Sequence, residues 1–411
     1  MSPEDGPVLP QELLDLVIDH LADDLQTLRS CALVSSSVLQ YSRVHIFSRL
    51  RVGPLNKDNL RDGPLDGDHA IGTLLKLFRH SPTVAARVKS LHLWDNIMRR
   101  FSWISAEATP HPVAQFSSFL VSLTRLCITI ESGFVHWANI SPAMRTSIRA
   151  TVALPNLTCL EIAGMYGLPY TLLAHCPALR SITLKWSTFD ERDDHDFAST
   201  LAACAGSPRI ELENLDLELD SSVLRRLARW ILLPESPLDV TRLSTFTCVC
   251  DHPSDSAVLQ QLIDAAEPAL QSLRLQNVAN PLDLHALAQL RTLEFAHELP
   301  LEPRVTWLRN HIIFPLPPRT LDLVLHVITP RTGAWAPMMD LIGADRALSL
   351  LPPCVAGISV VLAGSNVDRP RWGAPELELV DVSSEYSGSM PALRDRQMRE
   401  GREPFHVLRH A

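Results

Sequence analysis

A spaced pattern of apolar residues recurs along most of this chain and constrains its fold more than any other feature. The pattern is apolar-x-x-apolar-x-apolar, and its last two positions alternate as they do in a strand with one buried face. It occurs as Val88/Leu91/Leu93, Leu123/Leu126/Ile128, Leu157/Leu160/Ile162, Leu179/Ile182/Leu184, Leu212/Leu215/Leu217, Leu243/Phe246/Cys248, Leu270/Leu273/Leu275, Leu290/Leu293/Phe295 and, more weakly, Pro318/Leu321/Leu323. Successive middle positions lie 20 to 35 residues apart, a period that is typical of repeat architectures.

Helix-like stretches lie between these strands, for example at residues 221–232 and 256–266. One strand and one helix are too small to bury their own apolar side, so each unit must stack on its neighbours. Right-handed crossovers then give a parallel sheet with helices on one face. The sequence therefore predicts an α/β fold, an irregular β/α solenoid over residues 70–380. An ordinary α/β domain whose strands happen to be apolar is the alternative.

The first fifty residues have a different pattern and predict three short helices. The first covers residues 9–21, the second follows Asp24 as its N-cap, and the third begins within residues 35–37. Apolar residues of the first helix span an arc of roughly 200°, about twice what one core needs; they are Leu13, Leu14, Leu16, Val17, Ile18 and Leu21. Such a small unit with excess apolar surface is expected to dock onto a partner.

Two segments interrupt or end the repeats. Residues 51–69 contain Gly53-Pro54 and Gly63-Pro64 and predict a linker, after which a helix runs from about residue 69 to 80. Residues 381–411 hold arginines mixed with acidic residues. We expect them to form a frayed C-terminal tail.

The order of residues in the first three helices resembles the F-box, in the form found in fungal, basidiomycete-type families. The likeness covers about residues 7–50 and runs through Leu9-Pro10-x-Glu12-Leu13, Asp24-Leu25, Leu33-Val34 and Ser42-Arg43-x-His45-x-Phe47. It implies binding to a Skp-type adaptor, which links the F-box to a cullin-based ubiquitin ligase called SCF. The residues that it assigns to adaptor binding are Leu9, Pro10, Leu13, Ile18, Leu21, Leu25, Leu28, Leu33 and Val34. The family usually has Cys-Arg and an aromatic residue after Leu-Val, where this chain has Ser35, Ser36 and Val38.

The repeats resemble the irregular leucine-rich repeats that follow many F-boxes, without the asparagine of strict repeats. In such strands the residues between the apolar positions face a concave surface. The expected target-binding residues are Trp94, Arg125, Glu161, Lys185, Asp216, Glu218 and Arg274, with His92, Thr183 and Glu294 on the same face. The resemblance thus implies a substrate-recognition adaptor that holds an unknown protein target. The alternatives are a leucine-rich-repeat scaffold outside any ligase, with the first helices as a cap, and an enzyme assembled from scattered residues.

Motifs of catalysis and cofactor binding are missing from the sequence. No Gly-x-Ser-x-Gly, Walker, Rossmann or His-Glu-x-x-His motif occurs. Cys248-x-Cys250-x-His252 has no second ligand pair of zinc spacing, so we interpret it as core. The acidic run at residues 190–196 lacks the spacing of a calcium loop. We expect no catalytic residue, no metal site and no cofactor.

Charge and composition limit the classes of partner that this chain is expected to bind and the cellular compartment in which it is expected to occur. The net charge is −9 with no long basic run, which argues against nucleic acid as a partner. Residues 347–367 lack charge, but Pro352-Pro353 breaks them and residues 355–362 read as a strand, so no membrane span is expected. The eight cysteines form no C-x-x-C pair and the acidic N-terminus has no signal core. A cytoplasmic or nuclear protein is expected.

Overall fold

The computed structural model describes most of the chain between residues 10 and 297 and four strands beyond it. The described residues are 10–53, 67–96, 104, 115, 118–131, 133–190, 201–202, 209–250, 255–278, 282–284, 286–297, 321–329, 355–364, 379–381 and 406–410. The chain divides into two compact units. Unit 1 comprises residues 1–179 and 187–208, and unit 2 comprises residues 180–186 and 209–411. Both are α/β, and each is built around parallel strands.

Unit 1 begins with three helices where the sequence predicts them. They are α1 (Gln11–His20), α2 (Leu25–Cys31) and α3 (Ser36–Ile46). Asp24 Oδ1 caps α2 by accepting hydrogen bonds from the backbone N–H groups of Gln26 and Thr27, at 3.1 and 3.0 Å. Ser35 Oγ caps α3 by accepting from the N–H of Val38 at 3.3 Å. Each short helix therefore has a defined beginning.

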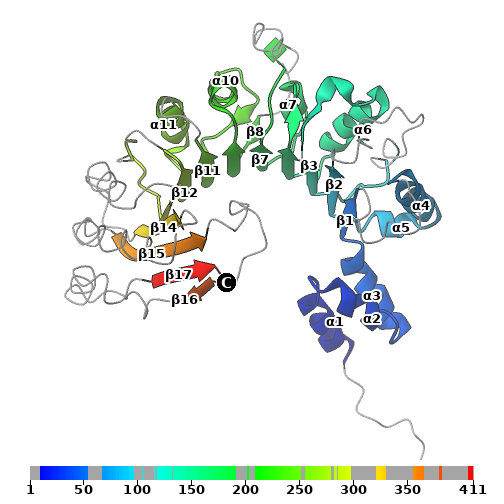
Figure 1. Cartoon of the computed structure of the whole chain (residues 1–411). Coiled ribbons are helices and arrows are strands. Elements are labelled where there is room, and N and C mark those ends of the chain that lie inside the picture. Colours follow the sequence, from blue (N-terminus) through cyan, green and yellow to red (C-terminus); the bar gives the residue numbers. More distant parts are fainter. Residues whose placement is uncertain are drawn as a thin grey trace, which may run out of the picture. The chain divides into compact units, whose positions relative to one another are not determined.

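Among the described residues of unit 1, four parallel strands form a sheet with helices along one side (Figure 1). In order across the sheet the strands are β1 (Arg49–Val52), β2 (Ser90–Asn96), β3 (Arg125–Glu131) and β5 (Cys159–Ala163). The helices are α4 (Gly67–His80), α5 (Pro82–Ala85), α6 (Pro142–Val152) and α7 (Thr171–Ala174). The short strands β4 (Val135–His136) and β6 (Met165–Tyr166) pair separately, and a 3-10 turn, η4 (Trp137–Asn139), follows β4.

Strand β1 was not expected. It pairs with β2 in parallel, so Arg51 and Val52 belong to the sheet although residues 51–69 were predicted to be a linker. Helix α4 likewise begins at Gly67, inside that predicted linker. Residues 54–66 lie outside the described part of the chain. Pairing with β2, which the local Gly-Pro signals do not reveal, makes this segment a strand.

Unit 2 also contains parallel strands, and helices are described between β9 and β12 (Figure 1). Its strands, in order across the sheet, are β7 (Ser181–Lys185), β9 (Asn214–Glu218), β11 (Thr245–Val249), β12 (Ser272–Gln276), β13 (Thr292–His297), β14 (Leu321–Thr329), β15 (Val355–Gly364), β17 (His406–His410) and β16 (Leu379–Asp381). All these pairings are parallel except that of β16 with β17. Helices α10 (Ser221–Ile231) and α11 (Ser256–Ala266) lie where the sequence predicts helices. The short strands β8 (Ile210–Glu211) and β10 (Leu238–Asp239) pair with each other.

The predicted strand pattern is confirmed by burial and by register. The middle apolar positions lie side by side in each unit, as Leu91, Leu126 and Leu160 do in unit 1, and all three are buried. The ninth pattern is displaced, because Leu293 pairs with Leu323 and not with Leu321. Side chains of a strand alternate with a period of two residues. The apolar positions therefore predict which side chains point inward, but a shift of two residues in the pairing with the next strand leaves that pattern unchanged.

The C-terminal strands correct one prediction and confirm another. Residues 406–410 form β17 and pair with β15, so the segment expected to be a frayed tail contributes to the sheet. The apolar segment around residues 355–362 is strand β15, as predicted. Among the described residues, no helix combines the length and the apolar character that crossing a membrane requires.

Candidate functional site

The three N-terminal helices enclose a very small core. Ile18, Leu28 and Val38 are its buried residues. Five further side chains are partly buried against them, namely Leu14, Leu21, Cys31, Tyr41 and Ile46. This core accounts for one side of α1 only, because Leu14, Ile18 and Leu21 are spaced to share one helix face.

Large apolar side chains remain exposed on the other sides of the helices. Leu13, Leu16 and Val17 are about half exposed, and their spacing places them on one face of α1. Leu33 and Val34, in the turn after α2, are 87% and 76% exposed. We call Leu13, Leu16, Val17, Leu25, Leu33 and Val34 the helical surface. Exposed apolar side chains concentrated on so small a unit are typical of a protein-binding surface.

The helical surface overlaps the predicted adaptor-binding residues in part. Pro10, Leu13, Leu25, Leu33 and Val34 are exposed, and Leu21 is half-buried. The prediction that Ile18 and Leu28 contact the adaptor is corrected. Their side chains are only 3% and 0% exposed and form the core of the three helices. Leu9 lies outside the described residues. Leu16 and Val17 belong to the surface but were not among the residues assigned by resemblance, although both lie on the wide apolar arc.

The described contacts between the helices and the sheet of unit 1 use other residues. Arg87 donates to the carbonyl oxygen of Gln40 at 3.2 Å. Arg49 Nη1 lies 2.6 Å from Asp23 Oδ1. The carbonyl oxygen of Ser48, between α3 and β1, accepts from two backbone N–H groups at the start of β2. These contacts leave the helical surface exposed.

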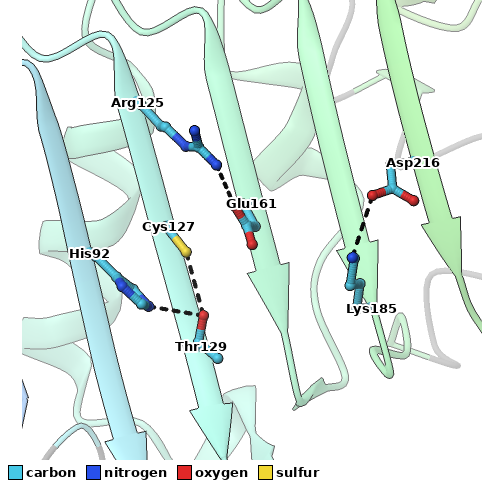
Figure 2. A network of polar contacts seen from close by, with 7 residues as sticks. All are labelled: His92, Arg125, Cys127, Thr129, Glu161, Lys185 and Asp216. Atoms are coloured by element: carbon cyan, nitrogen blue, oxygen red, sulfur yellow. Dashed lines mark hydrogen bonds and ion pairs between the residues drawn. The ribbon is translucent and has the colours of Figure 1, made fainter. Parts of the chain in front are cut away.

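A polar network occupies the face of the unit 1 sheet opposite its helices, which we call the strand face of unit 1 (Figure 2). Arg125 Nη2 donates to Glu161 Oε2 at 2.9 Å. Between the strands, His92 Nε2 and Cys127 Sγ lie 3.0 and 3.4 Å from Thr129 Oγ1. The register places Arg51, His92, Cys127 and Glu161 in one row across β1, β2, β3 and β5.

The environment of this network sets the protonation of its groups. Burial, reinforced by the charge of Arg51, lowers the pKa of His92, which is therefore neutral at neutral pH. The hydrogen bond to Glu161 raises the pKa of the Arg125 guanidinium. Burial, with a smaller contribution from Glu161, raises the pKa of the Cys127 thiol to about 12. A thiol of that pKa stays protonated and is a poor nucleophile, so this network is suited to binding and not to thiol catalysis.

Trp94 lies on the expected face but is largely covered. Its residue is 8% exposed, and the guanidinium carbon of Arg51 lies 4.8 Å from the centre of its ring. The indole therefore supports Arg51 more than it offers a surface of its own. Sequence reasoning missed Arg51 because it was placed in a linker. The alternation of Arg49-Leu50-Arg51-Val52 was the available signal.

The corresponding face of unit 2 carries two further pairs of opposite charge. Lys185 Nζ lies 3.5 Å from Asp216 Oδ2, and Arg274 forms an ion pair with Glu294 (Figure 2 shows the first). Glu218 is half-buried in the row that contains Lys185. Trp186 follows β7 with a φ of 46° and a side chain that is exposed. Among the described residues of this face, Asp216 and Glu294 are thus each held by a neighbouring cation.

The two cysteines of the Cys248-x-Cys250-x-His252 motif lie in the core, as predicted. Cys248 and Cys250 are buried, with their sulfur atoms 3.9 Å apart. Mutual hydrogen bonding and burial raise the pKa of Cys248. His252 and residues 191–196 of the acidic run lie outside the described residues. Within the described ranges, no three His, Cys, Asp or Glu side chains gather as metal ligands would.

Comparison with known proteins adds no family. No protein-family model matches this chain. No curated protein matches it either. The fold and the two surfaces therefore define it as an α/β protein with mainly parallel strands, preceded by three helices that expose apolar side chains.

Proposed function

We propose that this chain is the substrate-recognition adaptor of an SCF-type ubiquitin ligase. In this proposal the first three helices are an F-box that binds a Skp-type adaptor through the helical surface. The β/α units are irregular leucine-rich repeats whose strand faces bind a protein target. Such a complex would work in the cytoplasm or the nucleus.

The exposure of the helical surface is the observation that carries the proposal. Six large apolar side chains between 44% and 87% exposed lie on α1, on α2 and in the turn after α2, in a unit whose buried core has three residues. Burial of apolar area contributes about 25 cal/mol per Å², so covering these side chains with a partner would stabilise a complex. The choice of a Skp-type adaptor as that partner rests on the resemblance of about residues 7–50 to the F-box.

The departures from the F-box pattern are compatible with this role. Ser35 caps α3, and Val38 packs into the core of the helices. Both residues therefore maintain the local fold, although they replace the residues usual in the family. Leu33 and Val34, which match the family, remain the most exposed of the apolar residues.

The proposed mechanism requires no chemistry from this chain. A target held on the strand faces would be placed near the ubiquitin-bearing part of the ligase. Holding two reactants together raises their effective concentration, which alone accelerates transfer. The neutral, hydrogen-bonded groups of the unit 1 network suit such a binding role.

Direct binding to a purified Skp-type adaptor tests the proposal. Leu33→Asp and Leu13→Asp place a charge in the apolar contact, and each should weaken binding by about a hundredfold or more. The matched control is Val121→Asp, because Val121 is as exposed as Leu13 but lies outside the three helices. Wild-type protein that does not bind the adaptor, or Leu33→Asp protein that binds as wild type does, would refute the assignment.

A repeat scaffold outside any ligase is the second candidate. The polar networks of the strand faces favour it, because they do not depend on the helical surface. Affinity capture with wild type and with the Leu13→Asp/Leu33→Asp variant separates the two. An adaptor loses ligase subunits in the variant and keeps its targets. A scaffold captures the same proteins with both and no ligase subunit with either.

A further inference from the structure

The strand face of unit 1 carries three arginines whose charges are balanced in different ways. Arg49 and Arg51 project from β1, and Arg125 from β3. Arg49 pairs with Asp23, and Arg125 pairs with Glu161. Arg51 lies over the Trp94 ring. An aromatic ring attracts a cation but does not neutralise it, and no carboxylate within the described ranges forms an ion pair with Arg51.

The position of the Arg51 side chain is restrained by the Trp94 ring beneath it. The indole beneath it is fixed, because Trp94 is buried and lies against Gly53 of the chain directly after β1. A guanidinium carries its N–H groups in its own plane, so one that lies over an aromatic ring can still donate from its outer edge to both oxygens of a carboxylate. Restraint of the side chain before binding reduces the entropy that binding costs.

The groups around Arg51 also suit an anion. His92 separates Arg51 from Cys127 in the same row, and it is neutral because burial and Arg51 lower its pKa. Arg125 also lowers the pKa of His92, whereas Glu161 and Glu131 act in the opposite direction. A bound carboxylate would add to the effect of the two glutamates and would raise the pKa of His92. Binding of an anion here therefore has a local reporter.

We propose that the strand face of unit 1 binds an acidic segment of a protein, with an Asp or Glu side chain of that segment on Arg51 and with Arg125 two strands away on the same face. This inference rests on the proposed function in one respect, namely that the bound segment belongs to a target of the ligase. Nucleic acid fits less well, because the chain has a net charge of −9 and two of these three arginines already pair with carboxylates.

Peptide binding to the full-length chain tests the inference. The probes are a fluorescent peptide of alternating Glu and Ser, the same peptide with Lys for Glu, and a single-stranded oligonucleotide. We expect the Glu peptide to bind most tightly, and more weakly as salt is raised. Arg51→Gln should weaken its binding about tenfold, the range for one charge-assisted pair. The matched control, Arg242→Gln, removes an exposed arginine of unit 2 that pairs with Glu211 and should leave binding unchanged.

The imidazole of His92, followed by NMR, gives a readout that a change in folding would not mimic. The Glu peptide should raise the pKa of His92 in wild type and much less in Arg51→Gln. The Leu13→Asp/Leu33→Asp variant should bind the peptide normally, so a failure of adaptor binding and a failure of this inference are distinguishable. The inference is overturned if the Lys peptide or the oligonucleotide binds as tightly as the Glu peptide, or if a correctly folded Arg51→Gln binds the Glu peptide as wild type does.

Discussion

Gly53 lies so close to Trp94 that no side chain fits between them. A Cβ atom on Gly53 would lie 2.4 Å from the carbonyl oxygen of Trp94 and 2.6 Å from its Cε3 atom. The first of these contacts is with backbone, which cannot rotate away. Close approach of the chain after β1 to β2 thus depends on glycine and holds the indole on which Arg51 lies.

Gly53→Ala should therefore destabilise unit 1. The clash forces β1 and β2 apart, at a cost of about 1–3 kcal/mol. Gly72→Ala is the matched control, since a Cβ at this position in α4 meets nothing within 4 Å. It should raise stability by about 0.4–1 kcal/mol because alanine restricts the unfolded chain. Urea unfolding measures both, and equal midpoints for the two variants would contradict the structure.

Two leucines of the N-terminal helices should respond very differently to truncation. Leu28 is fully buried, so Leu28→Ala should cost about 2–5 kcal/mol. Leu13 is half exposed, so Leu13→Ala should change the free energy of unfolding by less than about 0.5 kcal/mol. Circular dichroism during urea titration tests the pair. A similar loss in both variants would mean that Leu13 is part of the core and not of the helical surface.

Acid should destabilise the protein partly through His92. Its pKa in the folded chain lies below the unfolded value of about 6.5. The unfolded chain therefore binds more protons between these two values, and stability falls as the pH drops below about 6.5. His92→Gln should lose less stability over this range than wild type, as measured by urea midpoints across the pH series. His175→Gln, which removes an exposed histidine, should follow wild type.

Two ion pairs of unit 2 should contribute differently to the free energy of unfolding because they differ in burial. The Glu294 side chain is 8% exposed and that of Arg274 is 38% exposed, so Glu294→Ala removes a partly buried charge-assisted hydrogen bond and should cost about 1.5–3 kcal/mol. Glu213 and Arg180 are each about half exposed, and Glu213→Ala should cost about 0–1 kcal/mol. Thermal unfolding of both variants checks the order. Equal losses would show that the Glu294 carboxylate is more solvated than described.

The strands and their inward side chains could be predicted from local spacing. Leu91 and Leu93 alternate on β2, and the same two-residue alternation marks the other main strands. Asp24 and residues 256–266 likewise carried a capping signal and a helical period, and both predictions are confirmed. These elements depend on which residues lie within a few positions of each other, which the sequence states directly.

Pairing between distant segments could not be predicted in this way. Arg125 meets Glu161 across 36 residues, and the irregular spacing of the repeats does not reveal that register. Arg51 appeared to belong to a linker because its strand exists only through β2. The burial of Ile18 and Leu28, against the exposure of Leu13, depends on how three helices pack together. The position of the site therefore follows from contacts that a linear pattern does not contain.

The junction between α3 and β1 limits how the chain can present a bound protein. Only Phe47 and Ser48 lie between the two elements, and two extended residues reach about 7 Å. Under the proposed function, the distance between the ligase adaptor and the bound target would be set by helices and strands and not by a flexible linker. Which lysines of the target receive ubiquitin would then depend on the orientation in which the target is bound. A Gly-Ser insertion after Phe47 should increase the number of target lysines that are modified.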